Sequence, residues 1–238
     1  MRLDKLLANC GLGSRKEIKA LMRKGAVTVD GAPVSDPATH VDPERQAVTL
    51  NGQTVHYREF VYLLLHKPPG YVSATFDRHL PVVTELVPPE YAHFDVFPVG
   101  RLDIDTEGLL ILTNDGAFSH RVLAPASHVP KTYYARVEGE LSSEHIHQFA
   151  QGITLDDGYQ CLGAELTLLS PTEAQVTIHE GKFHQIKRMF AAVGAEVIYL
   201  KRISFGALTL PDDLKCGKIC ELTEEEIQLA QEEHHEHC

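Results

Sequence analysis

The N-terminal part of the chain carries two short helical patterns of apolar residues. Three leucines within residues 3–7 recur at helical spacing, and this pattern stops at Gly11. Ser14 and Glu17 have the spacing of a capping box, so we expect a second helix to begin there. Gly25 marks the expected end of that helix. The pattern therefore predicts a helix, a turn and a second helix.

A hairpin pattern follows the two helices. Val27 and Val29 alternate with polar residues and lead into the pair Asp30 and Gly31, after which Val34 resumes the alternation. An Asp-Gly pair between alternating apolar residues is a strong hairpin signal, because both positions tolerate positive φ. We therefore expect a β-hairpin here.

The second predicted helix carries a ridge of positive charge. Arg15, Lys19 and Arg23 recur at four-residue steps and so share one face, while Ile18 and Met22 point elsewhere. On charge alone, a solvated helix face explains this ridge. The alternative is a surface that binds the phosphates of RNA.

Beyond residue 50, apolar runs of strand length are mixed with helical patterns. We expect residues 51–59, which are polar, to form a linker, so that a domain of residues 1–59 precedes one of residues 60–238. Strands and helices do not alternate strictly, which favours an α+β fold with a mixed or antiparallel sheet. The expected strands lie at residues 60–65, 109–113, 132–137, 174–179 and 196–200, and the expected helices at residues 143–151 and 184–193.

Composition narrows the class of protein. The 238 residues are enough for one small and one medium domain, and 43% of them are hydrophobic. No apolar run approaches the ~18 residues of a membrane span. The N-terminus turns polar too early for a secretory signal. We therefore expect a monomeric cytoplasmic protein that does not insert into a membrane.

The five cysteines are odd in number and scattered, which indicates reduced thiols. Cys216 and Cys220 could form a metal site with the C-terminal histidines His234, His235 and His237. Their C-x3-C spacing matches no strong zinc signature, so we expect no metal.

The net charge of -11 hides an uneven distribution. Residues 221–238 hold seven glutamates and neither Lys nor Arg, whereas residues 1–24 hold seven basic side chains against two acidic ones. An RNA partner is compatible with the basic end, and a solvated helix end accounts for the acidic one.

A dense cluster of charge precedes the apolar run at residues 109–112. Asp103, Asp105 and Glu107 resemble the start of a calcium loop, but Asn114 stands where that loop requires a bidentate Glu. Two alternatives are left, a capped and solvated turn or a catalytic carboxylate with a cationic partner. A nearby cation favours the ionised, reactive form of such a carboxylate.

A candidate cation lies 84 residues downstream of Asp103. Residues 183–193 show the apolar spacing of a helix, and Lys187 and Arg188 sit near its start. The helix dipole disfavours cations there, so both side chains need specific anionic partners.

Several segments together resemble known proteins. Residues 1–50 resemble the S4 RNA-binding module, most clearly in the hairpin GAVTVDGAPV. Four further motifs follow in order and resemble the pseudouridine synthases of the RsuA group over nearly the whole chain. These motifs are KPPGYV from Lys67, GRLDIDTEGLLILTNDG from Gly100, KTYYARV from Lys131 and EGKFHQIKRMFAAVG from Glu180.

The resemblance implies roles for particular residues. It assigns Asp103 as the catalytic aspartate, Tyr133 as the tyrosine that lies against the target base, and Lys187 as the partner of the aspartate. The alternation of Tyr133 with Ala135 and Val137 agrees with an inward-facing phenol. Asp105 and Glu107 would repel Asp103 in one pocket, so we expect them to face the loop or solvent. The residues expected to bind RNA are Arg15, Lys16, Lys19, Arg23, Lys67, Arg101, His184 and Arg188.

The implied reaction is the isomerisation of one uridine in RNA. The bond between N1 and C1′ breaks, the uracil turns, and C5 joins C1′, with Asp103 either attacking the sugar or assisting its deprotonation. The target base must leave its stack to reach the carboxylate. No cofactor is required, and the segment around His184 favours 16S ribosomal RNA, free or in an assembling small subunit, as the partner.

Three other functions compete with this one. The first is a synthase of the same group acting on 23S ribosomal RNA, and the second is a noncatalytic RNA-binding ribosome assembly factor. The third is a glycosidase that uses Asp103 and Glu180 as paired carboxylates, which would release free base or sugar.

Overall fold

The computed structural model describes residues 1–232 as two units. One unit consists of Met1–Val61 together with Pro88–Asp95, and the other of Tyr62–Val87 and the remainder of the chain from Val96. The three histidines of the hypothetical metal site and the last part of the acidic tail lie outside the described residues. Within residues 1–232, no helix combines the length and apolar character needed to cross a membrane.

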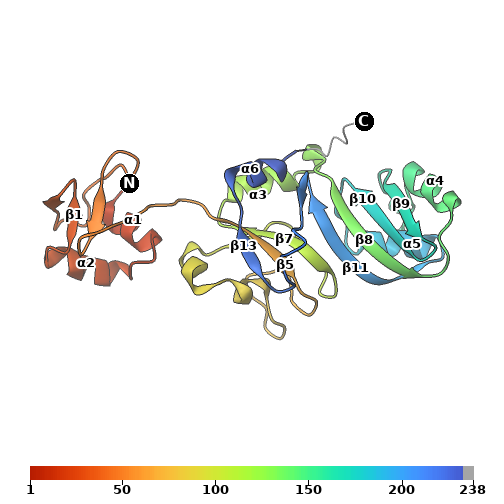
Figure 1. The fold of residues 1–238 in the computed structure, drawn as a ribbon, viewed down its shortest axis with the longest axis horizontal. Helices are drawn as coiled ribbons and strands as arrows, with labels where there is room; N and C mark the ends of the chain where they lie inside the picture. The colour runs from red at the N-terminus through yellow and green to blue at the C-terminus, as the bar shows by residue number, and fades with distance from the viewer. Residues whose placement is uncertain (233–238) are drawn as a thin grey trace. The chain divides into compact units, whose positions relative to one another are not determined.

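Two helices and a four-stranded antiparallel sheet build the first unit (Figure 1). The capping box forms as predicted, because the amide of Ser14 donates to Glu17 Oε2 over 2.8 Å and the amide of Glu17 donates to Ser14 Oγ over 3.3 Å. The predicted hairpin is also confirmed, and the strand order is β2-β1-β3-β4. The elements are α1 (Leu3–Asn9), α2 (Arg15–Arg23), β1 (Val27–Val29), β2 (Ala32–Pro33), β3 (Val48–Leu50) and β4 (Gln53–Thr54).

The predicted linker at residues 51–59 is partly wrong. Gln53–Thr54 forms β4, which pairs with β3 through the turn at Asn51 and Gly52. Both turn residues have positive φ, 52° and 81°, as the Asn-Gly pair of a tight hairpin requires. The segment looked like a linker because it is polar, although its Asn-Gly pair is itself a turn signal.

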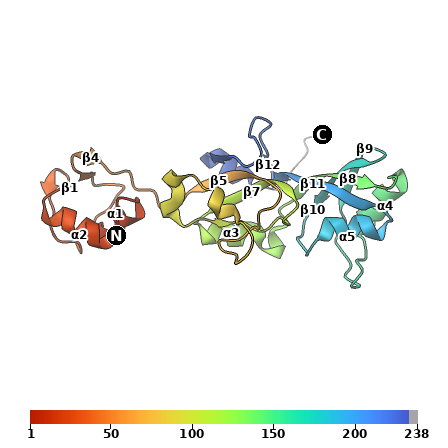
Figure 2. The same cartoon turned by 90° about the horizontal axis from the view of Figure 1, so that it is seen from below.

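A nine-stranded sheet dominates the second unit (Figures 1 and 2). Its main path runs β13-β5-β7-β11-β8-β10-β9, with β12 added to β11 and β6 added to β7. The pairing is antiparallel except between β7 and β11, so the α+β fold with a mixed sheet is confirmed. The strands are β5 (Tyr62–Lys67), β6 (Phe97–Pro98), β7 (Glu107–Thr113), β8 (Lys131–Glu138), β9 (Glu165–Ser170), β10 (Glu173–Ile178), β11 (Glu196–Phe205), β12 (Leu208–Thr209) and β13 (Ile219–Glu221).

Helices pack against this sheet in the middle and at one end of its strand path. α4 contacts β9, α5 contacts β11, and α6 contacts β12. The α-helices of this unit are α3 (Gly116–Leu123), α4 (Ser143–Gln151), α5 (Gln185–Ala192) and α6 (Glu224–Leu229), and its 3-10 helices are η1 (Val83–Leu86) and η3 (Pro125–Ser127). A further 3-10 helix, η2 (Pro89–Phe94), belongs to the first unit. Short or weakly patterned elements, such as β13 and α3, escaped prediction.

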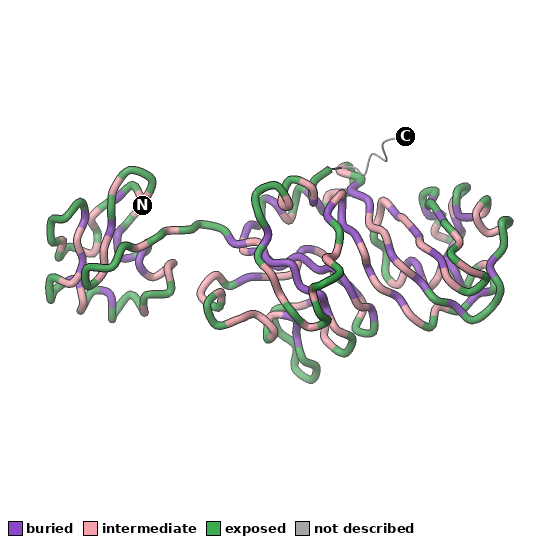
Figure 3. Tube along the Cα trace, viewed as in Figure 1, coloured by how far each residue is buried: buried purple, intermediate pink, exposed green. Residues whose placement is uncertain are grey.

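The strands β5 and β7 are buried along almost their whole length (Figure 3). Such near-continuous apolar runs are typical of strands covered on both faces. Leu64 of β5 and Ile111 of β7 belong to the core cluster that also contains Phe118 and Val122 of α3. The apolar run that follows the charged segment is thus the centre of the domain.

Gly108 allows the parallel pair β7 and β11 to approach closely. Its φ is +108°, and a Cβ at this position would lie 2.2 Å from the carbonyl oxygen of Arg202 and 2.6 Å from its amide nitrogen. A backbone conformation that L residues rarely adopt therefore coincides with a contact that leaves no room for a side chain. Glycine is required here on both grounds.

We expect Gly108→Ala to lower the free energy of unfolding by at least about 3 kcal/mol, because strain and a backbone clash add. Chemical denaturation of the purified full chain measures this difference. Gly116→Ala is the matched control, since Gly116 begins α3 without positive φ and a Cβ there would meet nothing within 4 Å. A Gly108→Ala variant as stable as the control would contradict the role of Gly108.

Candidate active site

A buried lysine holds the loop that carries the central carboxylate. Lys67 has no exposed surface, and its Nζ donates to the carbonyl oxygens of Pro68, Asp103, Ile104 and Thr106 over 2.9 to 3.3 Å. Burial lowers the pKa of Lys67 to about 8, although the charges of Asp105 and Asp103 oppose this shift. The prediction that Lys67 contacts RNA is therefore wrong, because the side chain is fully buried and its ammonium group is hydrogen-bonded within the protein.

The segment after Lys67 fixes the same loop by further hydrogen bonds. The amide of Gly70 donates to the carbonyl oxygen of Ile104 over 2.7 Å. The hydroxyl of Ser73 donates to the carbonyl oxygen of Leu102, and the amide of Leu102 donates back to the same hydroxyl, both over 3.0 Å. The motif that begins at Lys67 thus acts as a support for the loop around Asp103.

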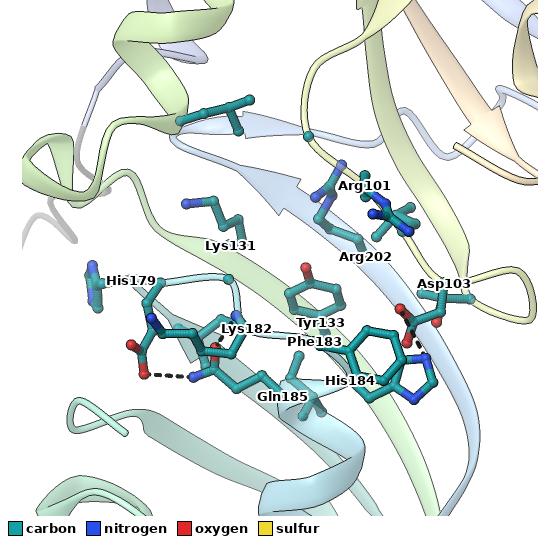
Figure 4. Close-up of a pocket in the computed structure, with 18 of the residues that line it drawn as sticks. Arg101, Asp103, Lys131, Tyr133, His179, Lys182, Phe183, His184, Gln185 and Arg202 are labelled. Atoms are coloured by element: carbon teal, nitrogen blue, oxygen red, sulfur yellow. Dashed lines mark hydrogen bonds and ion pairs between the residues drawn. The ribbon is translucent and has the colours of Figure 1, made fainter. Parts of the chain in front are cut away.

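Asp103 is paired with the lysine that the sequence indicated. Lys187 Nζ lies 3.2 Å from Asp103 Oδ2, and the Asp103 side chain is 26% exposed. His184 Nε2 lies 3.7 Å from the other carboxylate oxygen (Figure 4). Lys187 belongs to the first turn of α5, so the carboxylate supplies the anionic partner that a cation there requires.

Asp105 is exposed as expected, but it shares Lys187 with Asp103, and Glu107 departs from the expectation by bonding to β11. Lys187 Nζ also donates to Asp105 Oδ1 over 2.6 Å, although two thirds of the Asp105 side chain is exposed. Burial raises the pKa of Asp105, but the hydrogen bond and charge of Lys187 outweigh it and hold this pKa below its usual value. Glu107 instead accepts a hydrogen bond from the Tyr199 hydroxyl over 2.9 Å. Lys187 therefore forms ion pairs with the carboxylates of both Asp103 and Asp105.

Asp103 and Tyr133 line one cavity of about 640 Å³ in the second unit. Tyr133 is 8% exposed, and the alternation along β8 turns it inward as predicted. Its cross-strand partners are Val176 of β10 and Arg202 of β11. Figure 4 shows the phenol ring in the middle of the cavity wall, with Asp103 to one side. The volume suits a nucleoside-sized group.

The remaining predicted RNA contacts divide into three groups. Arg101 and His184 line the cavity, and Arg101 is exposed. Arg188 belongs to α5, as Lys187 does. It forms ion pairs with Asp156 and Asp157, which neutralise its charge. The third group is exposed in the first unit, as predicted for the ridge, and consists of Arg15, Lys16, Lys19 and Arg23.

Three cavity residues were not singled out from the sequence. Lys131 lies two positions before Tyr133 and so shares its face of β8, which the alternation could have indicated. Arg202 was missed because the strand expected at residues 196–200 continues to Phe205. The apolar spacing of residues 183–193 placed Phe183 on the core face of a helix, and this is wrong. The helix begins at Gln185, and Phe183 is 72% exposed and stacks on His184, with 3.8 Å between the ring centroids.

The glycosidase hypothesis requires a second free carboxylate, and Glu180 does not supply one. Glu180 Oε2 accepts a hydrogen bond from the Tyr159 hydroxyl over 2.8 Å. Its Oε1 accepts from the amide of Leu162 over 3.0 Å and from Gln185 Nε2 over 2.8 Å. Both carboxylate oxygens of Glu180 are therefore engaged in hydrogen bonds within the protein, one of them to Gln185 of α5. Glu180 is not a second free carboxylate.

One group of possible metal ligands occurs within the described residues, away from the cavity lining. Ligand atoms of His66, Glu107 and Cys216 lie within 4.8 Å of one another. His66 Nδ1 is 2.7 Å from the carbonyl oxygen of Leu214, which leaves Nε2 towards the group. Glu107 is engaged by Tyr199, and none of the three residues lines the cavity that holds Asp103.

Comparisons with known families agree with the two units. Residues 61–192 match the RNA pseudouridylate synthase family, and residues 1–46 match the S4 domain. A solved structure described as a pseudouridylate synthase superimposes with a TM-score of 0.69 at 31% identity, covering 97% of this chain and 99% of that one.

Relatives of known sequence extend over nearly the whole chain. The "Uncharacterized RNA pseudouridine synthase YtzG" of Bacillus subtilis is 49% identical, covering 98% of this chain and 99% of that protein. The "Ribosomal small subunit pseudouridine synthase A" of Escherichia coli strain K12 is 39% identical, covering 95% of this chain and 98% of that protein. The chain therefore belongs to the RNA pseudouridine synthase family, as an RsuA-type enzyme with an S4 domain before its synthase domain.

Proposed function

We propose that this enzyme isomerises one uridine of 16S ribosomal RNA to pseudouridine, with Asp103 as the reacting carboxylate. The observation that carries the proposal is the ion pair of Asp103 and Lys187 in a cavity that Tyr133 also lines. The reaction breaks the bond between N1 and C1′ and forms one between C5 and C1′, so product and substrate have the same atoms.

The surroundings of Asp103 suit a reaction at the sugar. Lys187 Nζ lies 3.2 Å from the carboxylate and gives it a cationic partner within the cavity. Asp103 acts either by attacking C1′ or by assisting deprotonation of the sugar. A flipped uracil would lie against the Tyr133 ring, since a base inside a stacked helix cannot reach the carboxylate.

Two observations support 16S ribosomal RNA as the substrate. Relatives named "Ribosomal small subunit pseudouridine synthase A" from Yersinia pestis and Escherichia coli are 41% and 39% identical over most of this chain. The segment FHQIKRMF, with His184 beside Asp103, also resembles those enzymes. The substrate is either the free RNA or an assembling small subunit, and the cytoplasmic location and monomeric state stay predictions.

The basic ridge of α2 would supply RNA affinity rather than choice of uridine. Arg15, Lys19 and Arg23 are exposed on a helix whose Ile18 and Met22 are buried. Contacts to phosphates position a protein on RNA without reading its sequence. The S4 domain would therefore hold the RNA while the synthase domain selects the nucleotide.

We expect Asp103→Asn to lower pseudouridine formation by at least about a thousand-fold, because the amide keeps the size of the side chain but loses its charge. Pseudouridine mapping on 16S ribosomal RNA incubated with the purified variant measures this loss. RNA binding should persist, and normal turnover in this variant would overturn the role of Asp103.

Asp105→Asn is the matched control for this experiment. It makes the same chemical change two residues away and removes the second carboxylate on Lys187. Because an exposed ion pair contributes at most about 1 kcal/mol, we expect turnover within about fivefold of the unmodified enzyme. Mapping 16S and 23S ribosomal RNA side by side also tests the alternative substrate, and no pseudouridine in either RNA would favour the assembly factor.

We expect Arg15→Glu combined with Lys19→Glu to weaken RNA binding and to lower the slope of log affinity against log salt by about 1.4 to 1.8, as loss of two phosphate contacts predicts. Filter binding over a salt series measures the slope. Lys5→Glu combined with Arg45→Glu changes the net charge equally on exposed residues outside the ridge. Equal slopes for the two double variants would mean that the ridge is only a solvated face.

A further inference from the structure

Two cations line the cavity beside Tyr133 without a carboxylate partner among the described residues. Arg202 lies opposite Tyr133 in the register of β11 and β8, and Lys131 lies opposite Phe205. Tyr133 and Lys131 are two residues apart on β8, so they share one face of the sheet. Figure 4 shows Lys131 and Arg202 on the same side of the phenol ring, away from the loop of residues 180–185.

Arg202 is buried with unused hydrogen-bonding capacity. It is 2% exposed, and its Nε donates to the carbonyl oxygen of Leu109 over 2.7 Å. Its Nη2 is buried and has no hydrogen-bond partner within the described chain. An unsatisfied buried donor is costly, and more so when it carries charge, so this guanidinium calls for an acceptor that the protein does not provide.

Lys131 adds a second positive charge next to Arg202. Its Nζ donates to the carbonyl oxygen of Val129 over 2.6 Å and lies 5.4 Å from the centroid of the Phe205 ring. Arg202 Cζ lies 5.3 Å from the same centroid. Burial and the charge of Arg202 lower the pKa of Lys131 to about 8. The protein thus holds two like charges together at a cost in stability.

Two cations of α5 already have carboxylate partners. Lys187 pairs with Asp103 and Asp105, and Arg188 pairs with two carboxylates. No carboxylate in residues 1–232 lies within ion-pair distance of Lys131 or Arg202. Arg101 and Lys182 of the lining share this property, but Arg202 is buried and has an unused donor. An anionic partner for these two groups therefore has to come from outside residues 1–232.

We propose that Lys131 and Arg202 bind a backbone phosphate of the RNA strand whose uridine enters the cavity. The arginine supplies directed donors and the lysine a point charge, which together suit phosphate oxygens. Holding the phosphate beside Tyr133 fixes the ribose relative to Asp103, so binding energy is used for orientation. This inference rests on the proposed function, because it takes RNA as the substrate.

The test compares Lys131→Gln, Lys131→Arg and a control, Lys215→Gln, which removes an exposed lysine outside the cavity lining. Filter binding of the full chain to a 16S ribosomal RNA transcript is measured over a salt series. We expect Lys131→Gln to weaken binding at low salt by about tenfold or more and to lower the salt slope by about 0.7 to 0.9, one phosphate contact. Lys131→Arg should keep the slope.

Thermal unfolding of the free variants separates binding from structure. Because Lys131→Gln removes a charge next to Arg202, we expect its melting temperature to equal or exceed that of the unmodified protein. A lower melting temperature with an unchanged salt slope would overturn the proposal and make Lys131 a structural residue. A slope for Lys131→Gln equal to that of Lys215→Gln, or one that Lys131→Arg fails to restore, would also overturn it.

Pseudouridine mapping on the same transcript separates this inference from the proposed function. If the unmodified enzyme forms no pseudouridine but Lys131→Gln lowers the salt slope, the substrate assignment fails and the phosphate site stands. If the unmodified enzyme is active and Lys131→Gln binds with the original slope, the substrate assignment stands and the phosphate site fails.

Discussion

The arrangement of the active site depends on one buried ammonium group. Lys67 ends β5, a buried strand that pairs with β7, and its Nζ contacts four carbonyl oxygens, three of them in the loop that carries Asp103. Burying a charge costs several kcal/mol unless hydrogen bonds compensate it. The loop therefore cannot change conformation without leaving this ammonium unsatisfied, and the position of the Asp103 carboxylate follows from the interior of the protein.

The balance of charge around the cavity explains how the site is divided. Lys187 is shared by Asp103 and Asp105, which keeps the carboxylates near a cation and near each other. On the other side of Tyr133, Lys131 and Arg202 have no such compensation in the described chain. One side of the cavity thus completes its ion pairs within the protein, while on the other side the phosphate that we propose would complete them. In that proposal, this asymmetry orients the RNA relative to Asp103.

The parallel contact of β7 and β11 brings these two sides together. Gly108 lets the backbone of β7 approach Arg202 so closely that no Cβ fits between them. Asp103 precedes β7 by a few residues, and Arg202 lies near the end of β11, almost a hundred residues later. A close backbone approach in the centre of the sheet therefore fixes the distance between the carboxylate and the cations.

The sequence by itself determined the local structure and indicated which charged groups lie together in the candidate site. Capping and turn residues fixed the helices and hairpin of the first unit, and alternation turned Tyr133 inward, because these signals depend on neighbouring residues alone. The motifs also indicated the pairing of Asp103 with Lys187. Only the tertiary structure decided that Lys67 is buried under the loop rather than exposed to RNA, and that Arg202 reaches the cavity. Burial and unsatisfied donors depend on strands far apart in the chain, so no local pattern contains them.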